Sequence, residues 1–247
     1  MRVVAVVPAR LASTRLPGKP LVELGGLPLV VRVYRMVERS PEVDEVLVAA
    51  DSQEVFEVAS SHGCRCVMTP PDLQSGGDRV AYVARDLEAE VVLNVQVDDP
   101  FVAPSTVSAL VRALQEAPEV GLALVASPIE DPSELFNPHV VKVVMDLQGF
   151  ALYFSRSPIP YRRSGDPLYF KHTGPYAYRK EFLLRFASSP PTPLELAESL
   201  EMLRVLEMGF KIKMVVSRYE GVEIDTPEDL ERARALLSSL GDPLLLP

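Results

Sequence analysis

Short apolar runs alternate with amphipathic segments through the first half of the chain. Val3–Val7, Glu45–Ala50 and residues 91–97 are short runs rich in β-branched side chains, typical of strands buried on both faces. Between them, segments such as 28–40 and 76–87 space their apolar residues every three or four positions, as one face of a helix requires. This alternation predicts an α/β fold, with a mostly parallel sheet flanked by helices on right-handed crossovers.

The rhythm changes after about residue 130. Two β-rich runs within 139–157 flank the string DLQG (146–149), which predicts a β-hairpin inserted into an otherwise single domain. Residues 169–178 favour one or two further strands. The other elements that the pattern predicts are strands over 65–69, 121–127 and 211–217, and helices over 52–63 (ended by Gly63 in a left-handed turn), 104–117, 193–209 and 226–240.

Composition narrows the class of protein. The 247 residues are 47% hydrophobic and 24% charged, as in an ordinary globular chain with a substantial core. A net charge of −9 argues against a nucleic-acid binder. The sequence has no apolar stretch long enough to span a membrane and no signal-peptide pattern, so we expect a cytoplasmic protein. Cys64 and Cys66 lack a second ligand pair, so we expect two small buried side chains rather than a metal site.

A positively charged loop follows the first predicted strand. Residues 8–21 contain Arg10, Arg15 and Lys19 and no acidic residue. Ligands of open α/β sheets bind beyond the carboxyl ends of the strands, and Arg and Lys suit phosphate. Neither a Walker A loop nor a G-x-G-x-x-G fingerprint is present. The loop therefore indicates a triphosphate or pyrophosphate site of another kind, with a solvated surface loop as the alternative.

Acidic residues follow two predicted strands. Asp98 and Asp99 end the run 91–97, and Asp225 lies between a short strand and a helix. Carboxylates that share Mg²⁺ with phosphate oxygens would suit this edge of the sheet. Asp98 and Asp99 could instead form a turn or a helix cap. For Asp225 the two interpretations are even, because the string DTPED is also a good helix start, with Asp or Thr as the cap.

Several motifs in order along the chain resemble one family. The resemblance is to the 3-deoxy-manno-octulosonate cytidylyltransferases, also called CMP-Kdo synthetases, and runs from residue 2 to about 236. It implies a nucleotidyltransferase-type, Rossmann-like fold and transfer of CMP from CTP to the acidic sugar Kdo, which releases pyrophosphate and activates Kdo for lipopolysaccharide synthesis. The motifs are residues 8–21, DLQSGGDR, NVQVDDP, FNPHVVKVV, ALYFSRSPIP and VEIDTPEDLER.

The resemblance also implies roles for individual residues. It places the triphosphate on Arg10, Arg15 and Lys19, and Mg²⁺ on Asp98 and Asp225, so that Lys19 and the two aspartates are the expected catalytic residues. The residues expected at the cytosine are Gln74, Ser75 and Gly76. The residues expected on the sugar side are Arg79, Gln96, His172, Tyr176 and Glu201, with Arg156 as a further anion contact.

The resemblance further implies how the chain is organised. Within one nucleotidyltransferase domain over 1–247, we expect a CTP-binding half over about 1–130, a sugar-binding and dimerisation region over about 131–225, and a terminal helix over 226–240. A homodimer with its contact in the 140–160 hairpin region is the expected assembly.

Two positions depart from the family pattern. Val97 stands where glycine is common, and Met202 where an amide is usual. Both changes concern the sugar side, so another acidic, sialic-like sugar is an alternative substrate. Two further alternatives are a sugar-1-phosphate nucleotidylyltransferase and a nucleotide-binding regulatory module without catalysis.

Overall fold

The computed structural model describes residues 1–218 and 221–244, and contacts divide these residues into two compact units. The first unit combines residues 1–108 with the C-terminal segment 221–244, so it is discontinuous in sequence. The second unit is formed by residues 109–218. Helix α4 (Pro104–Glu116) begins in the first unit and ends in the second.

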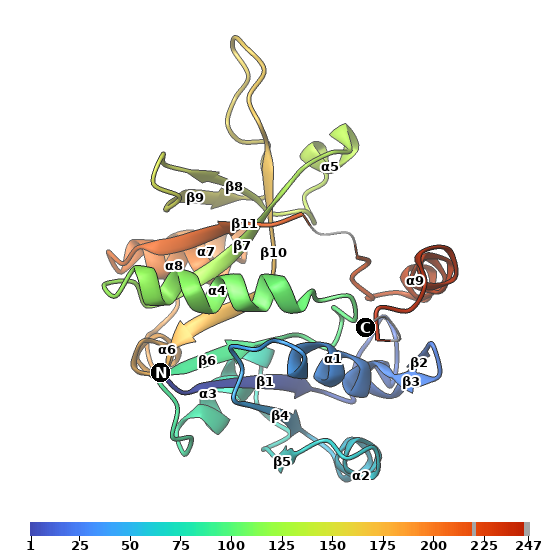
Figure 1. The fold of residues 1–247 in the computed structure, drawn as a ribbon. Helices are drawn as coiled ribbons and strands as arrows, with labels where there is room; N and C mark the ends of the chain where they lie inside the picture. The colour runs from blue at the N-terminus through green and yellow to red at the C-terminus, as the bar shows by residue number, and fades with distance from the viewer. Residues whose placement is uncertain (219–220, 245–247) are drawn as a thin grey trace. The chain divides into compact units, whose positions relative to one another are not determined.

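The first unit is built on a parallel sheet. Its strand order is β6–β1–β4–β5, with β1 at Val3–Ala9, β4 at Glu45–Ala50, β5 at Cys66–Met68 and β6 at Val91–Asn94 (Figure 1). Every residue of β1 is buried, as expected for a central strand covered on both faces. The parallel sheet predicted from the apolar runs is confirmed.

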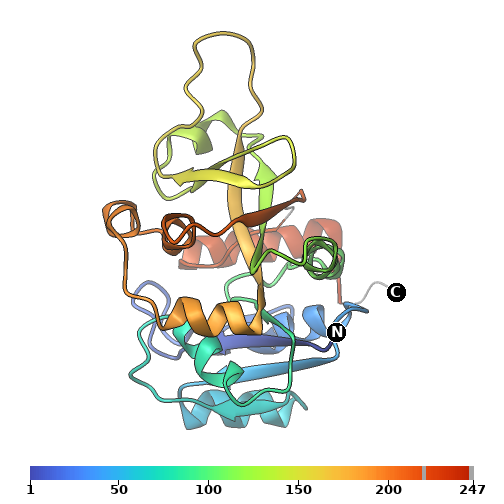
Figure 2. The same ribbon diagram turned by 90° about the vertical axis from the view of Figure 1, so that its left-hand side faces the viewer.

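Three helices connect these strands. The helices are α1 (Leu29–Glu38), α2 (Gln53–Ser61) and α3 (Gly76–Ala84). Helix α1 connects β1 to β4 and α2 connects β4 to β5, both in the same direction across the sheet, whereas α3 leads back in the opposite direction from β5 to β6. Right-handed crossovers in opposite directions place their helices on opposite faces, so α3 lies on the face opposite α1 and α2. Figure 2 shows α1 and α3 on opposite sides of β1. Because the four strands are parallel, their carboxyl ends lie at one edge of the sheet.

Short elements surround the start of α1. After β1 the chain makes a 3-10 turn, η1 (Lys19–Leu21), and a small antiparallel pair, β2 (Glu23–Leu24) and β3 (Leu27–Pro28). Their few residues carry no periodicity, so the sequence pattern did not predict them. The last helix, α9 (Pro227–Leu240), has the predicted bounds within one residue.

The second unit contains a mixed sheet. Strand β7 (Leu122–Pro128) pairs in parallel with β11 (Ile212–Val216) and antiparallel with β10 (Phe170–Arg179), and β10 pairs with the hairpin of β8 (Lys142–Met145) and β9 (Ala151–Ser155). The predicted hairpin is confirmed, and the one or two strands predicted over 169–178 are a single bulged strand, Phe170–Arg179. The loop between β9 and β10 extends away from these strands (Figures 1 and 2).

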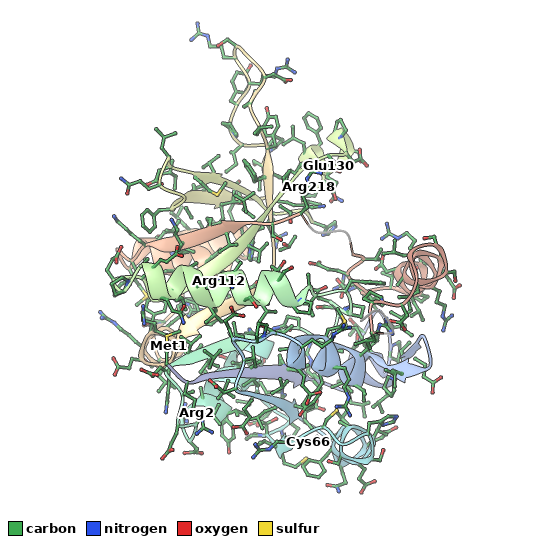
Figure 3. The ribbon with its side chains drawn as sticks, in the orientation of Figure 1. Met1, Arg2, Cys66, Arg112, Glu130 and Arg218 are labelled. Carbon is green, nitrogen blue, oxygen red and sulfur yellow. The ribbon has the colours of Figure 1, made fainter. Side chains whose placement is uncertain are left out.

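The carboxyl ends of β7 and β11 are tied together in the second unit. The Ser127 hydroxyl donates to the Ser217 carbonyl oxygen at 2.7 Å, and Arg218 Nε lies 3.8 Å from Glu130 Oε1 (Figure 3). Two short helices were not predicted in this unit, α5 (Pro132–Phe136) and α6 (Lys180–Ala187).

The single helix predicted over 193–209 is wrong. The structure has two helices, α7 (Pro193–Glu198) and α8 (Glu201–Glu207), separated by Ser199 in the left-handed region at φ 53°. Arg156 explains the break, because its Nε donates to the Glu198 carbonyl oxygen at 2.7 Å and its Nη2 to the Ser199 carbonyl oxygen at 3.3 Å. Long-range hydrogen bonds therefore take the carbonyls that a continuous helix would use, and apolar periodicity does not show them.

Two further sequence expectations can be compared with the structure. Cys64 is buried and Cys66 half-buried, and both are free thiols; burial raises the pKa of Cys64 to about 12. Across residues 1–218 and 221–244, we find no helix both long and apolar enough to cross a membrane.

Candidate active site

A cavity of about 280 Å³ lies at the carboxyl edge of the first unit's sheet. Its walls come from the loop after β1, the start of α3, the residues after β6 and the residue before Thr226, the N-cap of α9. These segments are far apart in the sequence, and the parallel topology brings them to one edge. The predicted site residues that line it are Arg10, Arg15, Lys19, Ser75, Gly76, Arg79, Gln96, Asp98 and Asp225.

Asp51 fixes the start of the positive loop. It directly follows β4, and its Oδ1 accepts a hydrogen bond from the Leu11 amide at 3.0 Å, while its own amide donates to the Ala9 carbonyl oxygen at 3.2 Å. Gly18, at φ +67°, then turns the chain into η1, which presents Lys19. Sequence reasoning missed Asp51, although its position after a predicted strand was the available signal.

Lys19 joins the two aspartates predicted to bind metal. Its Nζ lies 3.1 Å from Asp98 Oδ2 and 2.9 Å from Asp225 Oδ1. Arg15 Nη2 lies 2.9 Å from the other oxygen of Asp225. A backbone hydrogen bond of 2.8 Å from the Ile224 amide to the Asp98 carbonyl oxygen sets the two segments side by side. The structure thus brings into contact two carboxylates and two cations from three segments that are far apart in the sequence.

Asp225 is not the cap of α9. Thr226 is the N-cap, with its hydroxyl oxygen accepting from the Asp229 amide at 3.2 Å. Asp229 Oδ2 in turn accepts from the amides of Thr226 and Asp225, at 2.9 and 3.1 Å. This capping box rules out Asp225 as the helix cap and leaves its carboxylate to the cavity, so metal binding stays a prediction for this residue.

Burial and charge act against each other in this cluster. For Lys19, burial favours the neutral amine, but the charges of Asp98 and Asp225 outweigh it and raise its pKa. For Asp98, desolvation raises the pKa of the carboxyl, while the charge of Lys19 opposes that shift. Lys19 is therefore a permanent cation at neutral pH.

The carboxylates suit a hard divalent ion. Mg²⁺ is usually held by one or two carboxylates together with substrate phosphates and water. Asp98 and Asp225 supply such a pair in a cavity whose other charged lining residues are cations. Among residues 1–218 and 221–244 there is no cluster of three or more His, Cys, Asp or Glu side chains suited to a metal. The donor set fits an ion that takes its remaining ligands from a phosphate-bearing substrate.

The start of α3 forms another wall. Ser75 caps the helix, with its hydroxyl oxygen accepting from the Asp78 amide at 3.0 Å, and its own hydroxyl and backbone amide donate to the Asp78 carboxylate. A side chain at Gly76 would put its Cβ 2.9 Å from Gln96 Oε1, so glycine permits this close approach. Gln74 is exposed and not among the lining residues, and its carbonyl oxygen accepts from Arg10 Nη1 at 3.3 Å.

Hydrogen bonds to neighbouring residues hold the side chains of Arg79 and Gln96, which line the cavity. Arg79 is buried; its Nη1 donates to the Thr69 hydroxyl oxygen and, at 3.1 Å, to the Pro70 carbonyl oxygen. Burial lowers the pKa of Arg79. Gln96 Nε2 donates to Asn94 Oδ1 at 2.6 Å, which fixes its amide. Arg79 therefore ties the segment after β5 to α3.

The other predicted sugar-side residues belong to the second unit. His172 donates from Nδ1 to the Val125 carbonyl oxygen at 3.1 Å, so its Nε2 accepts from the Tyr176 hydroxyl at 3.2 Å. Burial lowers the pKa of His172 to about 4, which keeps the ring neutral. Glu201 begins α8, exposed, and the Arg156 guanidinium donates to backbone carbonyl oxygens.

The two departures from the family pattern fit the structure without strain. Val97 lines the cavity, and Ser199 is the one non-glycine residue with positive φ within the part of the chain described. Val97 therefore needs no glycine-only backbone conformation. Met202 is buried in α8.

Comparison with known proteins gives a consistent result. The sequence profile of the Cytidylyltransferase family matches residues 4–212. A 3-deoxy-manno-octulosonate cytidylyltransferase of Chloroherpeton thalassium is 46% identical over 242 residues, which cover 96% of this chain and 98% of the relative. One of Geobacter sulfurreducens is 43% identical, with 94% and 98% covered.

Solved structures agree with the sequence comparison. CMP:2-keto-3-deoxy-manno-octonic acid synthetase complexed with CTP superposes with a TM-score of 0.93 at 38% identity, covering 97% of this chain and 99% of that one. A 4-diphosphocytidyl-2C-methyl-D-erythritol synthase from Anaerococcus prevotii, at 17% identity and a TM-score of 0.64, shares the fold alone.

Proposed function

This chain belongs to the cytidylyltransferase family, and within it to the 3-deoxy-manno-octulosonate cytidylyltransferases, and from that membership we propose that the cavity of the first unit is its catalytic site. The enzyme is a nucleotidyltransferase that transfers CMP from CTP to Kdo. The observation that supports this location is the convergence of Arg15 and Lys19 on Asp98 and Asp225.

The reaction needs no nucleophile from the protein. The anomeric hydroxyl oxygen of Kdo attacks the α-phosphorus of CTP in line, and the bond from that phosphorus to the oxygen between the α- and β-phosphates breaks. Pyrophosphate leaves with that oxygen, and the hydroxyl proton passes to water. Such a transfer depends on positioning and charge neutralisation. Arg10, Arg15 and Lys19 would neutralise the triphosphate with charge-assisted hydrogen bonds, while Gly76 leaves room for a close approach of substrate to the wall of the cavity.

Asp98 and Asp225 would hold Mg²⁺. The bound ion would neutralise charge on the phosphate oxygens and favour loss of the proton from the attacking hydroxyl. The role of the chain is to keep both carboxylates at one place, through the hydrogen bond between Ile224 and Asp98 and through the capping box that frees Asp225.

The remaining residues would select the two substrates. We assign the contacts with cytosine to Gln74, Ser75 and Gly76, and the contacts with the sugar to a larger set of residues. His172 is neutral and has both ring nitrogens engaged, so in this set it would orient the Tyr176 hydroxyl rather than neutralise the sugar carboxylate. The larger set is Arg79, Gln96, Arg156, His172, Tyr176 and Glu201.

We also propose that two copies associate through the hairpin region of the second unit. Leu147 is fully exposed at the turn between β8 and β9, and Leu152 is 60% exposed on β9. Tyr161 and Leu168, on the loop after β9, are also exposed. Exposed apolar side chains close together in sequence favour a contact with a second copy. Sedimentation of the wild type and of Leu152→Lys would test it, with a monomeric variant as the expected result.

A cytoplasmic location is also proposed. Both cysteines are free thiols, as is usual in a reducing compartment. The activated sugar would then serve lipopolysaccharide synthesis in that compartment.

The assay that tests the proposed function is pyrophosphate release in the presence of Mg²⁺. CTP, UTP, ATP and GTP are each combined with Kdo, with a sialic acid, or with no sugar. We expect release with CTP and Kdo alone. Pyrophosphate release with the sialic acid but not with Kdo would favour a sialic-like sugar as the substrate. The absence of release with every combination of nucleotide and sugar would favour the regulatory module without catalysis.

A further inference from the structure

The two carboxylates proposed to bind metal are already occupied by cations of the chain. Lys19 Nζ contacts one oxygen of each, at 3.1 and 2.9 Å, and Arg15 Nη2 contacts the second oxygen of Asp225 at 2.9 Å. The Lys19 side chain is only 16% exposed, so water screens its two contacts less than the contact of Arg15, whose side chain is 64% exposed. The cluster has two positive and two negative charges and is neutral as a whole.

Neither ligand fits this neutral cluster by itself. A divalent ion would have to displace Lys19 from both carboxylates, which leaves the ammonium beside a cation of higher charge. A triphosphate alone would have to draw Arg15 and Lys19 away, which leaves Asp98 and Asp225 facing each other without a counter-charge. Each ligand therefore faces a cost that the other removes.

Together the two ligands complete an exchange of partners. The phosphates take the two cations and the metal takes the two carboxylates, so every charge keeps an opposite charge. Long Arg and Lys side chains can make this exchange by changing rotamers. Favourable interaction between two ligands that is absent for either alone is a positive coupling free energy, and it acts equally on both.

We propose that Lys19 and Arg15 close Asp98 and Asp225 to divalent ions until a nucleotide triphosphate takes up the two cations. Metal then binds with the nucleotide or after it, and not before it. This role rests on the proposed metal site, and it adds to Lys19 a function in the empty enzyme. The matching consequence is that metal increases the affinity for CTP by the same factor as CTP increases the affinity for metal.

The test counts bound Mn²⁺ by electron paramagnetic resonance, on the whole chain and without nucleotide. Lys19→Met keeps the length of the side chain and removes its charge. We expect this variant to bind Mn²⁺ about 10-fold more tightly than the wild type or more, a factor that corresponds to loss of a competing contact of about 1.4 kcal/mol. Lys180→Met, which removes a lysine charge from the second unit, is the matched control and should bind as the wild type does.

Two further variants make the result specific. Adding Asp98→Asn to Lys19→Met should abolish the gain. Arg15→Met should give a smaller gain, up to about 5-fold, because its contact with Asp225 is more exposed, and it serves where Lys19→Met fails to fold.

The outcomes separate the two proposals. If Lys19→Met and Arg15→Met bind Mn²⁺ no more tightly than the wild type, these two cations do not block the carboxylates, and the proposal is wrong. A second series contains CTP without sugar. There, wild type should hold more Mn²⁺ than Asp98→Asn and Asp225→Asn, and equal binding by all three would instead overturn the metal site itself.

Discussion

Asp225 shows how one residue type can serve two purposes that the sequence does not separate. An aspartate before a Thr-Pro pair is a good helix cap and also a good metal ligand. In the structure Thr226 and Asp229 make the cap, and the Asp225 carboxylate contacts Lys19 and Arg15. The capping partners exclude Asp225 as the cap, and they are found only by locating the hydroxyl and amide atoms, while its role as a metal ligand stays a prediction.

This assignment predicts a loss of activity with little loss of stability. Asp225→Asn removes the negative charge that a divalent ion needs, so we expect kcat to fall about 10²-fold or more, or about 2.7 kcal/mol. Asp98→Asn should behave in the same way. The measurement is kcat at saturating CTP, Kdo and Mg²⁺, together with the melting temperature.

Thr226→Ala is the control for the cap. It should lower stability by about 1 kcal/mol, since it removes the hydroxyl that accepts from the Asp229 amide. If Asp225→Asn keeps wild-type kcat while Asp98→Asn is inactive, the site has one carboxylate and the paired-metal mechanism is wrong.

His172 predicts how stability depends on pH. Its pKa is about 4 in the folded chain and about 6.5 when unfolded, so between these values the unfolded state binds a proton that the folded state does not. Stability contributed by the neutral ring is therefore present above pH 6.5 and lost as pH falls toward 4. Between pH 7 and pH 5 the loss should be at most about 2 kcal/mol.

The measurement is urea unfolding of the wild type and of His172→Gln at both pH values. The wild type should lose more stability than the variant on acidification. An equal loss in both proteins would show that the ring is not held neutral by the fold.

At the scale of elements, the spacing of apolar residues predicted an element well where burial of that element's own apolar side chains stabilises it. Strand β4 has its predicted bounds, and Gly63 ends the segment of α2 at φ +78° as expected. The pattern failed where distant groups decide the structure. Residues 193–209 have the spacing of one helix, and hydrogen bonds from Arg156 to the carbonyl oxygens of Glu198 and Ser199 divide it in two.

The break between α7 and α8 can be tested at Ser199. A left-handed conformation costs a residue with a Cβ about 1–2 kcal/mol, and more for a β-branched one. Ser199→Val should therefore destabilise the protein by about 1 kcal/mol or more relative to the wild type. Ser199→Gly should be neutral or slightly stabilising, because glycine relieves the strain but adds entropy to the unfolded chain. Urea unfolding measures both, and a Val variant as stable as the wild type would contradict the assigned conformation.

At the scale of the whole molecule, the site depends on a unit that is discontinuous in sequence. Sequence reasoning placed the positive loop and the carboxylates at the ends of predicted strands, and the parallel topology was enough to infer one edge for both. It could not place Lys19 between Asp98 and Asp225, because that contact depends on how the C-terminal segment returns to the first unit. The C-terminal segment must therefore fold onto the first unit for the site to form.

An ion pair between the buried Arg32 and the partly buried Asp242 holds the C-terminal segment against the first unit. Arg32 on α1 is fully buried, and its two terminal nitrogens contact the two carboxylate oxygens of Asp242, while Nη1 also donates to the Leu24 carbonyl oxygen at 3.3 Å. Gly25 lies against this pair at φ +60°, where a Cβ would be 2.9 Å from Arg32 Nη1. The pair thus ties the segment after α9 to the turn that follows η1.

Breaking this pair from one side should be costly. Asp242→Ala leaves the Arg32 guanidinium buried without its counter-charge, so we expect a loss of about 3–5 kcal/mol in the free energy of unfolding. The double variant Arg32→Met with Asp242→Ala should lose less than Asp242→Ala alone, because no uncompensated charge remains in the interior. Urea unfolding of the two variants and the wild type gives the comparison, with Glu38→Ala, at the exposed end of α1, as a surface control expected within about 0.5 kcal/mol of wild type. A double variant less stable than Asp242→Ala would show that Arg32 stabilises the unit through its other contacts and not through this pair.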